Sequence, residues 1–172
     1  YASLALFVDA TAWPENCNPQ TEAIRWLGEQ TLSGSAFVAA RLVSIDVHYG
    51  GGDGPDLESV ARHSRLAPAD VISRHAAARY TVAMLGFAPG FPYLIGMDPT
   101  LAVPRLATPR AHVPAGSVAI GGAQTGIYPR SGPGGWHIIG RTTLELFDPA
   151  RDPPALLAPG DQVRFVPAAD PR

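Results

Sequence analysis

The sequence contains no lysine: all 13 of its basic side chains, among 172 residues, are arginine. Schiff-base chemistry and a phosphate-binding loop of the P-loop type both need a lysine amine, so both are excluded. A site for a phosphate or a carboxylate must then use arginine side chains, backbone N–H groups or helix N-termini.

Cysteine is almost as scarce, because Cys17 is the only one. No disulfide can form within the chain, and a lone thiol fits a reducing, cytoplasmic location. The five histidines show neither an HxH nor an HExxH spacing, and no serine stands in a GxSxG elbow. We therefore expect no protein metal site and no familiar nucleophile, while a magnesium ion held through a substrate stays open.

Long apolar runs and a strong net charge are also missing. No run approaches the roughly 18 apolar residues of a membrane span. The net charge is −2, which is unlike that of a dedicated nucleic-acid-binding protein. We therefore expect no membrane and no nucleic acid among its partners. Hydrophobic residues make up 46% of the chain, so there is ample material for a core.

Acidic residues are nearly absent from the middle of the chain. Between residues 86 and 144 the only acid is Asp98. The same span contains four arginines: Arg105, Arg110, Arg130 and Arg141. A region cleared of carboxylates but rich in arginine is suited to binding an anion. Arginines scattered over the surface are the alternative, and the pattern alone does not decide between the two.

The first part of the chain has mixed helix and strand patterns. Residues 3–9 predict a buried strand and residues 18–30 a helix. Residues 41–49 alternate between apolar and polar, which predicts a strand. After the turn GGGDGPD, with Asp53 or Gly54 as N-cap, the spacing predicts helices over 55–64 and 68–78.

The pattern changes after Arg79, where short apolar runs alternate with Gly/Pro turns. Such punctuation is typical of a β-barrel or sandwich. We predict an α+β protein with a small α/β domain over residues 1–80 and a β-barrel over residues 81–172.

The segment GFAPGFPYLIG (86–96) is apolar, yet Pro89 and Pro92 oppose a regular core strand. We predict a loop whose rings form one wall of a cleft, because aromatic side chains supply apolar surface with few polar groups. The rings are those of Phe87, Phe91 and Tyr93, and the residues predicted on the opposite side are Gln124, Tyr128 and Arg141.

The segment from 121 to 141 combines polar side chains with seven glycines. Glycine lets a backbone approach a ligand closely, and an amide such as Gln124 can read the edge of another amide. A pair of β-hairpins with Gly/Pro turns explains many of the same residues. His75, near the end of its predicted helix, is a candidate general acid or base, and a packing role there is weighed equally.

Several motifs together resemble one known family. They are YGGGDGPDLESVA (49–61), GFAPGFPYL (86–94), QTGIYP (124–129), GGWHIIGRT (134–142) and PGDQVRFVP (159–167). These segments are similar to allophanate hydrolase subunit 1, also called the 5-oxoprolinase B subunit, a family that includes the sporulation histidine-kinase inhibitor KipI. The resemblance covers roughly residues 41–167.

The resemblance implies a fold, a partner and a cofactor. The fold is an α/β N-terminal domain, here shortened, followed by a cyclophilin-like β-barrel. The partner is a protein of the type called allophanate hydrolase subunit 2 or the 5-oxoprolinase C subunit, and the two are related to the carboxyltransferase part of urea carboxylase. ATP, with or without magnesium, is used in the complex, and no biotin is attached to this chain.

The favoured hypothesis is therefore a subunit of an ATP-dependent hydrolase that binds a small carboxylate-bearing amide and is inactive alone. The predicted catalytic residues are His75, Tyr128 and Arg141. The predicted substrate-binding residues are Phe87, Phe91, Tyr93, Arg110, Gln124, Thr125 and Arg130. Two alternatives stay open: a KipI-like protein that inhibits a sensor histidine kinase, and a component of a urea carboxylase or allophanate pathway.

Overall fold

The computed structural model describes positions 18, 21 and 25 and residues 40–168. By contacts the chain divides into two units, residues 1–39 and 40–172. The strand predicted over 3–9 and most of the helix predicted over 18–30 lie outside the described residues. Within that helix, the backbone N–H of Thr21 donates to Asn18 Oδ1 at 3.3 Å, which is the bond expected of an N-cap.

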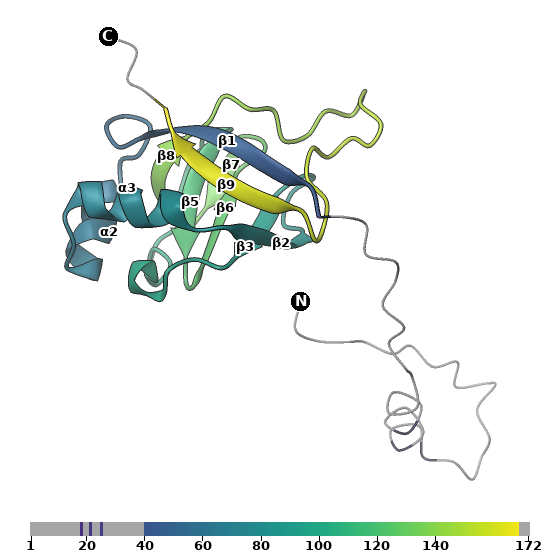
Figure 1. The fold of residues 1–172 in the computed structure, drawn as a ribbon, viewed down its shortest axis with the longest axis horizontal. Helices are drawn as coiled ribbons and strands as arrows, with labels where there is room; N and C mark the ends of the chain where they lie inside the picture. The colour runs from purple at the N-terminus through teal and green to yellow at the C-terminus, as the bar shows by residue number, and fades with distance from the viewer. Residues whose placement is uncertain (1–17, 19–20, 22–24, 26–39, 169–172) are drawn as a thin grey trace. The chain divides into compact units, whose positions relative to one another are not determined.

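The second unit is built around a closed seven-stranded barrel (Figure 1). Its strands follow the order β1-β8-β5-β6-β3-β2-β9. Their bounds are β1 (Leu42–Tyr49), β2 (Tyr80–Leu85), β3 (Pro92–Ile95), β5 (Ser117–Gly121), β6 (Gln124–Ile127), β8 (His137–Arg141) and β9 (Gln162–Pro167). The predicted α+β class with a β-barrel is confirmed.

Strand β1 closes the barrel, since it pairs antiparallel with β8 and parallel with β9. The alternation predicted for residues 41–49 is confirmed, because Ile45 and Val47 are fully buried while Ser44 and Asp46 are exposed. Ile45 lies opposite Phe165 of β9, which is also buried. The period-2 pattern therefore directs one face of β1 into the barrel.

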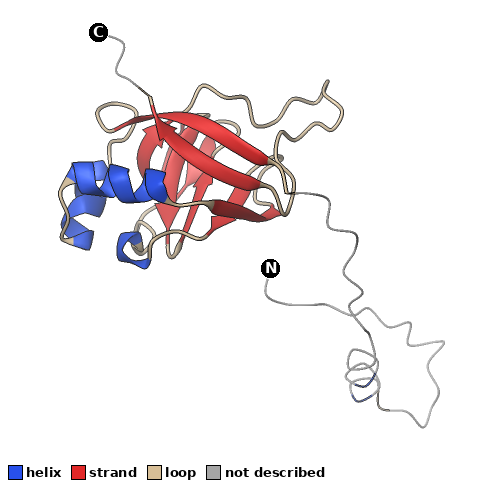
Figure 2. Cartoon of the chain, in the orientation of Figure 1, coloured by secondary structure: helices blue, strands red, loops and turns tan. Residues whose placement is uncertain are grey.

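Two helices gather on one side of the barrel (Figure 2). Helix α2 (Leu57–Ser64) packs against β8, and helix α3 (Pro68–Ala77) packs against β9. Both helices were predicted, but the N-cap of α2 is Asp56 rather than Asp53 or Gly54. The Asp56 carboxylate makes no capping bond, because it accepts hydrogen bonds from Arg110 and Ile138 instead.

Strand β3 corrects the prediction of a loop over the whole of 86–96. Pro92–Ile95 form a barrel strand that pairs with β2 and β6. Pro92 opens the strand, a position where its missing N–H is tolerated, and Leu94 is fully buried. Residues 86–91 and Gly96 lie outside the strand.

A small two-stranded sheet of β4 (Arg110–Val113) and β7 (Gly132–Gly134) lies beside the barrel. The short 3₁₀ helix η1 (Pro99–Leu101) lies between β3 and β4 in the chain. Val113 of β4 is fully buried and belongs to a second hydrophobic cluster, separate from the barrel interior. Ala119 belongs to the same cluster, while its neighbours Val118 and Ile120 belong to the interior cluster. The second cluster therefore covers the outer face of β5.

The main hydrophobic cluster combines the barrel interior with both helices. Val60 of α2 and Val71 of α3 are fully buried in it. The domain boundary predicted after residue 80 falls inside this unit, and β1, predicted for the first domain, is a barrel strand.

Candidate functional site

The loop before β3 makes two tight turns. The backbone N–H of Ala88 donates to the Gly86 carbonyl at 2.7 Å, and that of Phe91 donates to the Ala88 carbonyl at 3.0 Å. Phe87 lies at the centre of the first turn with φ of 66°. Its side chain is 64% exposed, whereas Phe91 is 2% exposed.

The rings of this loop meet two further rings of the second cluster. Phe91 contacts Tyr93, Tyr128 and Trp136 with centroid distances of 5.0, 5.3 and 5.6 Å, all edge to face. Such T-shaped pairs are the favoured geometry for aromatic side chains. They bring together residues that lie far apart in the sequence.

These rings line a cavity of about 150 Å³, here called the aromatic cavity. Its lining includes Phe87, Phe91, Tyr93, Arg105, Tyr128 and Trp136. A second cavity of about 270 Å³, the Arg130 cavity, shares Phe87 and Tyr128 with it. Phe87, Phe91 and Tyr93 therefore lie together, but Tyr128 packs against Phe87 and Phe91 rather than facing them across a cleft. That these rings form the wall of a ligand site stays a prediction.

Two glycines make this packing possible. A Cβ on Gly121 would lie 2.5 Å from the Trp136 ring, and one on Gly126 would lie 2.9 Å from Phe91. Both distances are too short for real contacts, so these positions exclude any larger residue without displacing a ring. The close approach that we expected of a ligand is made here by the protein's own aromatic side chains.

Two exposed arginines border the cavities. The Arg105 guanidinium carbon lies 5.8 Å from the Trp136 ring centroid, a cation–π contact at the aromatic cavity. Arg130 lines the neighbouring cavity. Among the ion pairs between described residues, neither arginine has a carboxylate partner. Their charges are therefore available to an anion.

The Tyr128 hydroxyl is one of the polar groups of the cavity lining, and the residue is 3% exposed. Burial raises the pKa of Tyr128 above its ordinary value, although a backbone hydrogen bond at Trp136 and the nearby Arg105 act in the opposite direction. The hydroxyl is therefore protonated at neutral pH.

Arg110 does not face this cavity. Its Nη2 donates to Asp56 Oδ1 at 2.6 Å, and the other carboxylate oxygen of Asp56 accepts from the backbone N–H of Ile138 at 2.7 Å. This ion pair joins β4 to the start of α2 and to β8. Asp56 thus engages one end of the guanidinium, while Arg110 also lines a cavity of about 180 Å³ away from the aromatic rings. The predicted substrate role of Arg110 stays a prediction.

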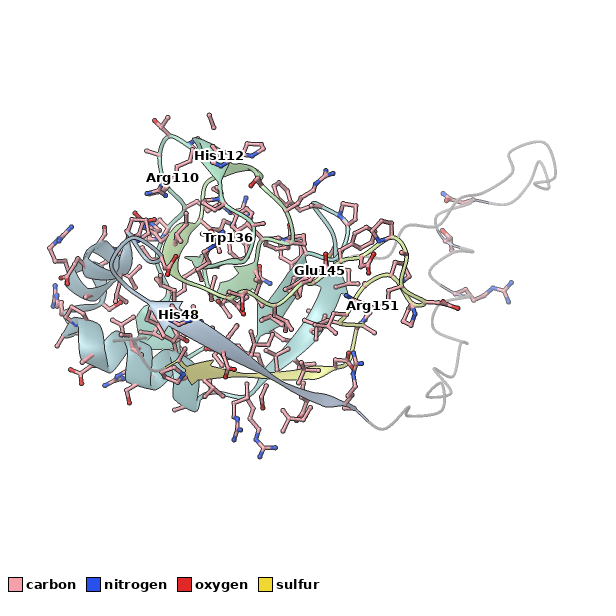
Figure 3. The ribbon with its side chains drawn as sticks, turned by 90° about the horizontal axis from the view of Figure 1, so that it is seen from above. His48, Arg110, His112, Trp136, Glu145 and Arg151 are labelled. Atoms are coloured by element: carbon pink, nitrogen blue, oxygen red, sulfur yellow. The ribbon has the colours of Figure 1, made fainter. Side chains whose placement is uncertain are left out.

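Arg141 borders other cavities, on the side of β1 and the glycine turn. Its Nε donates to the Ala115 carbonyl at 3.0 Å, and its Nη1 lies 3.9 Å from Asp53 Oδ1. It lines a cavity of about 780 Å³ with His48 and a smaller one of about 180 Å³ with Arg110 and His112. In Figure 3, Arg110 and His112 lie close together on β4, away from His48. Arg141 is not among the residues that line the aromatic cavity or the Arg130 cavity.

His75 is fully buried in the core. Its ring stacks on Phe165 at 4.6 Å, and its nitrogens contact the Tyr49 hydroxyl at 2.7 Å and Thr125 Oγ1 at 3.0 Å. Burial lowers the pKa of His75 to about 3. The expectation that it faces a cleft as an acid or base is corrected, since a neutral, enclosed ring cannot reach a substrate.

Thr125 is also fully buried, and its hydroxyl donates to the Ala119 carbonyl at 3.0 Å. It belongs to the core network with His75 and not to a cleft. Gln124, half-buried at the start of β6, is not among the residues that line the two aromatic-side cavities. The predicted amide-reading role of Gln124 stays a prediction.

Sequence reasoning missed three residues that shape the site. Arg105 was counted in the acid-poor span but given no role, and Trp136 was left outside the predicted wall. Asp56 gave no signal, since its partners Arg110 and Ile138 lie 54 and 82 residues away in the chain.

Within the part of the chain that the structure describes, no group of three or more His, Cys, Asp or Glu side chains could hold a metal ion. In the same part of the chain, each helix is too short or too polar to cross a membrane.

Comparison with known proteins places this arrangement in a family. The model for the carboxyltransferase domain, subdomain C and D, matches residues 1–157. The 5-oxoprolinase B subunit of Bacillus subtilis (strain 168) is 47% identical over 173 residues, which cover 96% of this chain and 72% of that protein. The chain belongs to the family of 5-oxoprolinase B subunits. Its predicted membership is thereby confirmed.

Another member of the family, the 5-oxoprolinase B subunit of Escherichia coli O157:H7, is 57% identical over 128 residues. That match covers 74% of this chain and 59% of the relative. The chain thus spans only part of the length of these relatives. A urea amidolyase of Lachancea kluyveri is 31% identical over 123 residues, which are 67% of this chain and 7% of that protein.

Solved structures agree with the fold. A conserved uncharacterised protein of Pyrococcus horikoshii matches with a TM-score of 0.73 and 46% identity, over 88% of this chain and 64% of that one. The urea amidolyase of K. lactis matches with a TM-score of 0.65 and 23% identity, over 76% of this chain and 10% of that one. The second likeness shows a shared fold alone.

Proposed function

We propose that this chain is one component of a heteromeric 5-oxoprolinase, an ATP-dependent enzyme that opens a lactam. In this proposal the aromatic cavity binds the small carboxylate-bearing amide. The names of the relatives from Bacillus subtilis and Escherichia coli O157:H7 support the activity. The observation that carries the site is the aromatic cavity bordered by arginines that have no carboxylate partner among the described residues.

The chemistry of the cavity suits a compact cyclic amide. Five aromatic rings supply apolar walls around about 150 Å³, which is a volume for a ring of five or six atoms rather than a nucleotide. Arg105 or Arg130 would hold the carboxylate through charge-assisted hydrogen bonds. The Tyr128 hydroxyl, kept protonated by burial, would orient the amide.

The remaining parts of the reaction belong to the complex. We propose that a partner of the 5-oxoprolinase C-subunit type completes the cleft, that ATP with magnesium is consumed in the complex, and that the chain alone is inactive. Arg105 takes the anion-binding role expected of Arg110, whose charge Asp56 engages. Arg141 and Gln124 remain candidates for contacts outside the aromatic cavity, and a cytoplasmic location remains part of the proposal.

The test is ATP-dependent consumption of 5-oxoproline by the chain mixed with its partner proteins. We expect turnover only in the complex. We also expect one of the two variants Arg105→Met and Arg130→Met to raise KM for 5-oxoproline at least about tenfold, the loss of one charge-assisted contact. Arg164→Met is the matched control, because Arg164 is an exposed arginine of β9 outside the aromatic cavity. Folded components that never consume 5-oxoproline would contradict the proposal.

One observation favours the second candidate, a protein that inhibits a sensor histidine kinase by binding it. Phe87 is the most exposed large hydrophobic residue of the described chain, and exposed aromatic side chains often anchor protein interfaces. A kinase that co-purifies with this chain, and is lost on Phe87→Ala, would support this reading, above all if no partner of the C-subunit type is captured.

A urea carboxylase or allophanate role is the third candidate, and it would require a biotinylated carrier on another protein. Loss of urea-dependent growth on deletion of the gene is its test.

A further inference from the structure

The backbone at Phe87 is held in an unfavourable conformation. Its φ of 66° lies in the left-handed region, and the hydrogen bond from Ala88 N–H to the Gly86 carbonyl closes a γ-turn around it. A γ-turn with positive φ is the rare, strained form, and a bulky side chain makes it costlier. Such strain persists only where the surroundings or a function require it, and it gathers at ligand sites.

Arg65 has a left-handed backbone for a common reason, namely that it caps the C-terminus of a helix. It is the other residue with positive φ, apart from glycines, in the described chain, and its φ is 56°. There the left-handed residue ends helix α2, and the N–H groups of Arg65 and Leu66 satisfy carbonyls of the last turn. Phe87 ends no helix.

Burial of the side chain does not explain the strained backbone of Phe87 either. Its side chain is 64% exposed, whereas the other exposed large hydrophobic residues of the described chain reach 44% at most. A strained backbone that holds a large apolar ring in solvent gains little packing in return. The reason for the strained backbone and the exposed ring therefore lies in the groups that surround the ring.

The ring stands between the two cavities. It lines the aromatic cavity, which contains Arg105, and the Arg130 cavity. Its neighbours fix its orientation, with Phe91 at 73° and Tyr128 at 88° to its plane. Both contacts are edge to face, so the ring is held without a stacked partner among the described residues, and its exposed surface is available to a flat group.

We propose that Phe87 determines ligand specificity by stacking on the planar amide of a small anionic ligand whose carboxylate is held by Arg105 or Arg130. This inference rests on the proposed function and adds the group that recognises the amide plane. A ligand with a five-membered ring and a carboxylate but no planar amide would gain much less binding free energy from stacking on Phe87. The strained turn holds the ring in place before the ligand arrives, which lowers the entropy lost on binding.

The test uses the complete complex with 5-oxoproline as substrate and tetrahydrofuran-2-carboxylate as a competitor without the amide. Phe87→Gly removes both the ring and the strain, Phe87→Leu keeps apolar bulk without a flat face, and Phe87→Tyr keeps the face. We expect the first two to raise KM for 5-oxoproline at least about tenfold, while the inhibition constant of the competitor changes less than about threefold. Phe87→Tyr should keep KM within about twofold of the parent.

Stability provides the second readout. We expect Phe87→Gly to leave Tm of the chain within about 3 °C of the parent, because relief of strain offsets the lost ring contacts. Arg65→Gly is the matched control: it relieves the same backbone strain at the helix end and should leave KM unchanged.

Each contrary result has a distinct meaning. An unchanged KM for Phe87→Gly in an active complex overturns the inference and leaves the proposed function standing. A fall in Tm of more than about 8 °C assigns the ring to packing and also overturns it. If the parent complex never consumes 5-oxoproline, the proposed function fails and the inference fails with it.

Discussion

At the scale of the residue, the hydrogen bonds of His75 fix which of its ring nitrogens carries the proton. Thr125 donates its one hydroxyl proton to the Ala119 carbonyl, so it accepts from His75 Nε2. Nδ1 is then unprotonated and accepts from the Tyr49 hydroxyl. With the neutral ring both nitrogens have a hydrogen-bond partner, and burial lowers the pKa of His75 in agreement with this.

Because the His75 ring is neutral in the folded protein, the stability of the barrel falls in acid. The folded pKa of about 3 lies below the ordinary value of 6.5, so the unfolded chain binds the proton more readily. The contribution of His75 to the free energy of unfolding is fully present above about pH 6.5. It is lost as the pH falls from there toward 3. We expect the free energy of unfolding to drop by about 2 kcal/mol from His75 alone between pH 7 and pH 5.

Denaturant unfolding at several pH values measures this effect. His75→Gln should be less stable at pH 7, because glutamine fills the site less well, but its stability should fall less steeply toward pH 5. Parallel pH profiles for the two proteins would show that the acid sensitivity comes from other groups.

At the scale of elements, one ion pair joins the sheet of β4 and β7 to the rest of the unit, in addition to the burial of Val113. Arg110 of β4 reaches Asp56 at the start of α2, and the same carboxylate accepts the Ile138 N–H of β8. Gly134 and Gly135, in and after β7, line the aromatic cavity. The pair therefore helps to place one wall of the proposed site.

Removing either partner should destabilise the unit unequally. Asp56→Ala leaves both the Ile138 N–H and the guanidinium without an acceptor, and we expect a loss of about 3 kcal/mol. Arg110→Met keeps an apolar stem, so a loss of about 1–2 kcal/mol is expected. Urea denaturation of the two single variants and the double variant gives the coupling, expected to be at least about 0.5 kcal/mol.

Arg141→Met is the control for that cycle. Its guanidinium and Asp53 are about half exposed and 3.9 Å apart, so its loss should cost less than about 0.5 kcal/mol. Strictly additive losses for Asp56 and Arg110 would mean that the observed contact contributes no coupling energy.

At the scale of the whole molecule, residues 40–172 form a unit with a closed barrel and a continuous core. We expect a chain that starts at Ala40 to be folded and to unfold in one cooperative transition, because closure leaves the barrel no long unpaired edge. Circular dichroism during heating measures this.

The same chain ended at Asp161 is the informative comparison. It lacks β9, which pairs with both β1 and β2, so the barrel cannot close and the partners of Ile45 are lost. No cooperative transition is expected for it. Equal unfolding curves for the two chains would contradict the role given to β9.

Local patterns predicted the elements because their causes are local. The alternation of residues 41–49, the helical spacing over 55–64 and 68–78, and the Gly/Pro turns of the barrel depend on neighbours within one or two turns of chain. Phe87 and Phe91 could be named for a similar reason, since rings among prolines and glycines cannot all enter a regular core element, whereas Tyr93 lies in strand β3.

Pairing across the barrel could not be predicted in this way. The pattern of α3 shows that His75 lies on its apolar side, but only packing against β9 and β6 encloses the ring. Charge counting grouped Arg105 with Arg110, yet Asp56, 54 residues before Arg110, engages only the latter. Strand order also separates Arg141 from Phe87, although both were assigned to one cleft.

By itself, then, the sequence determined the class of fold, the family and the chemistry excluded by the absence of lysine, and it pointed to Phe87, Phe91 and Tyr93 but not to Trp136. The tertiary structure decided which polar groups remain available to a ligand. The physical reason is that a charge or a hydrogen-bonding group acts on a ligand only if the fold has not already satisfied it, and the partners that do so lie far away in the chain.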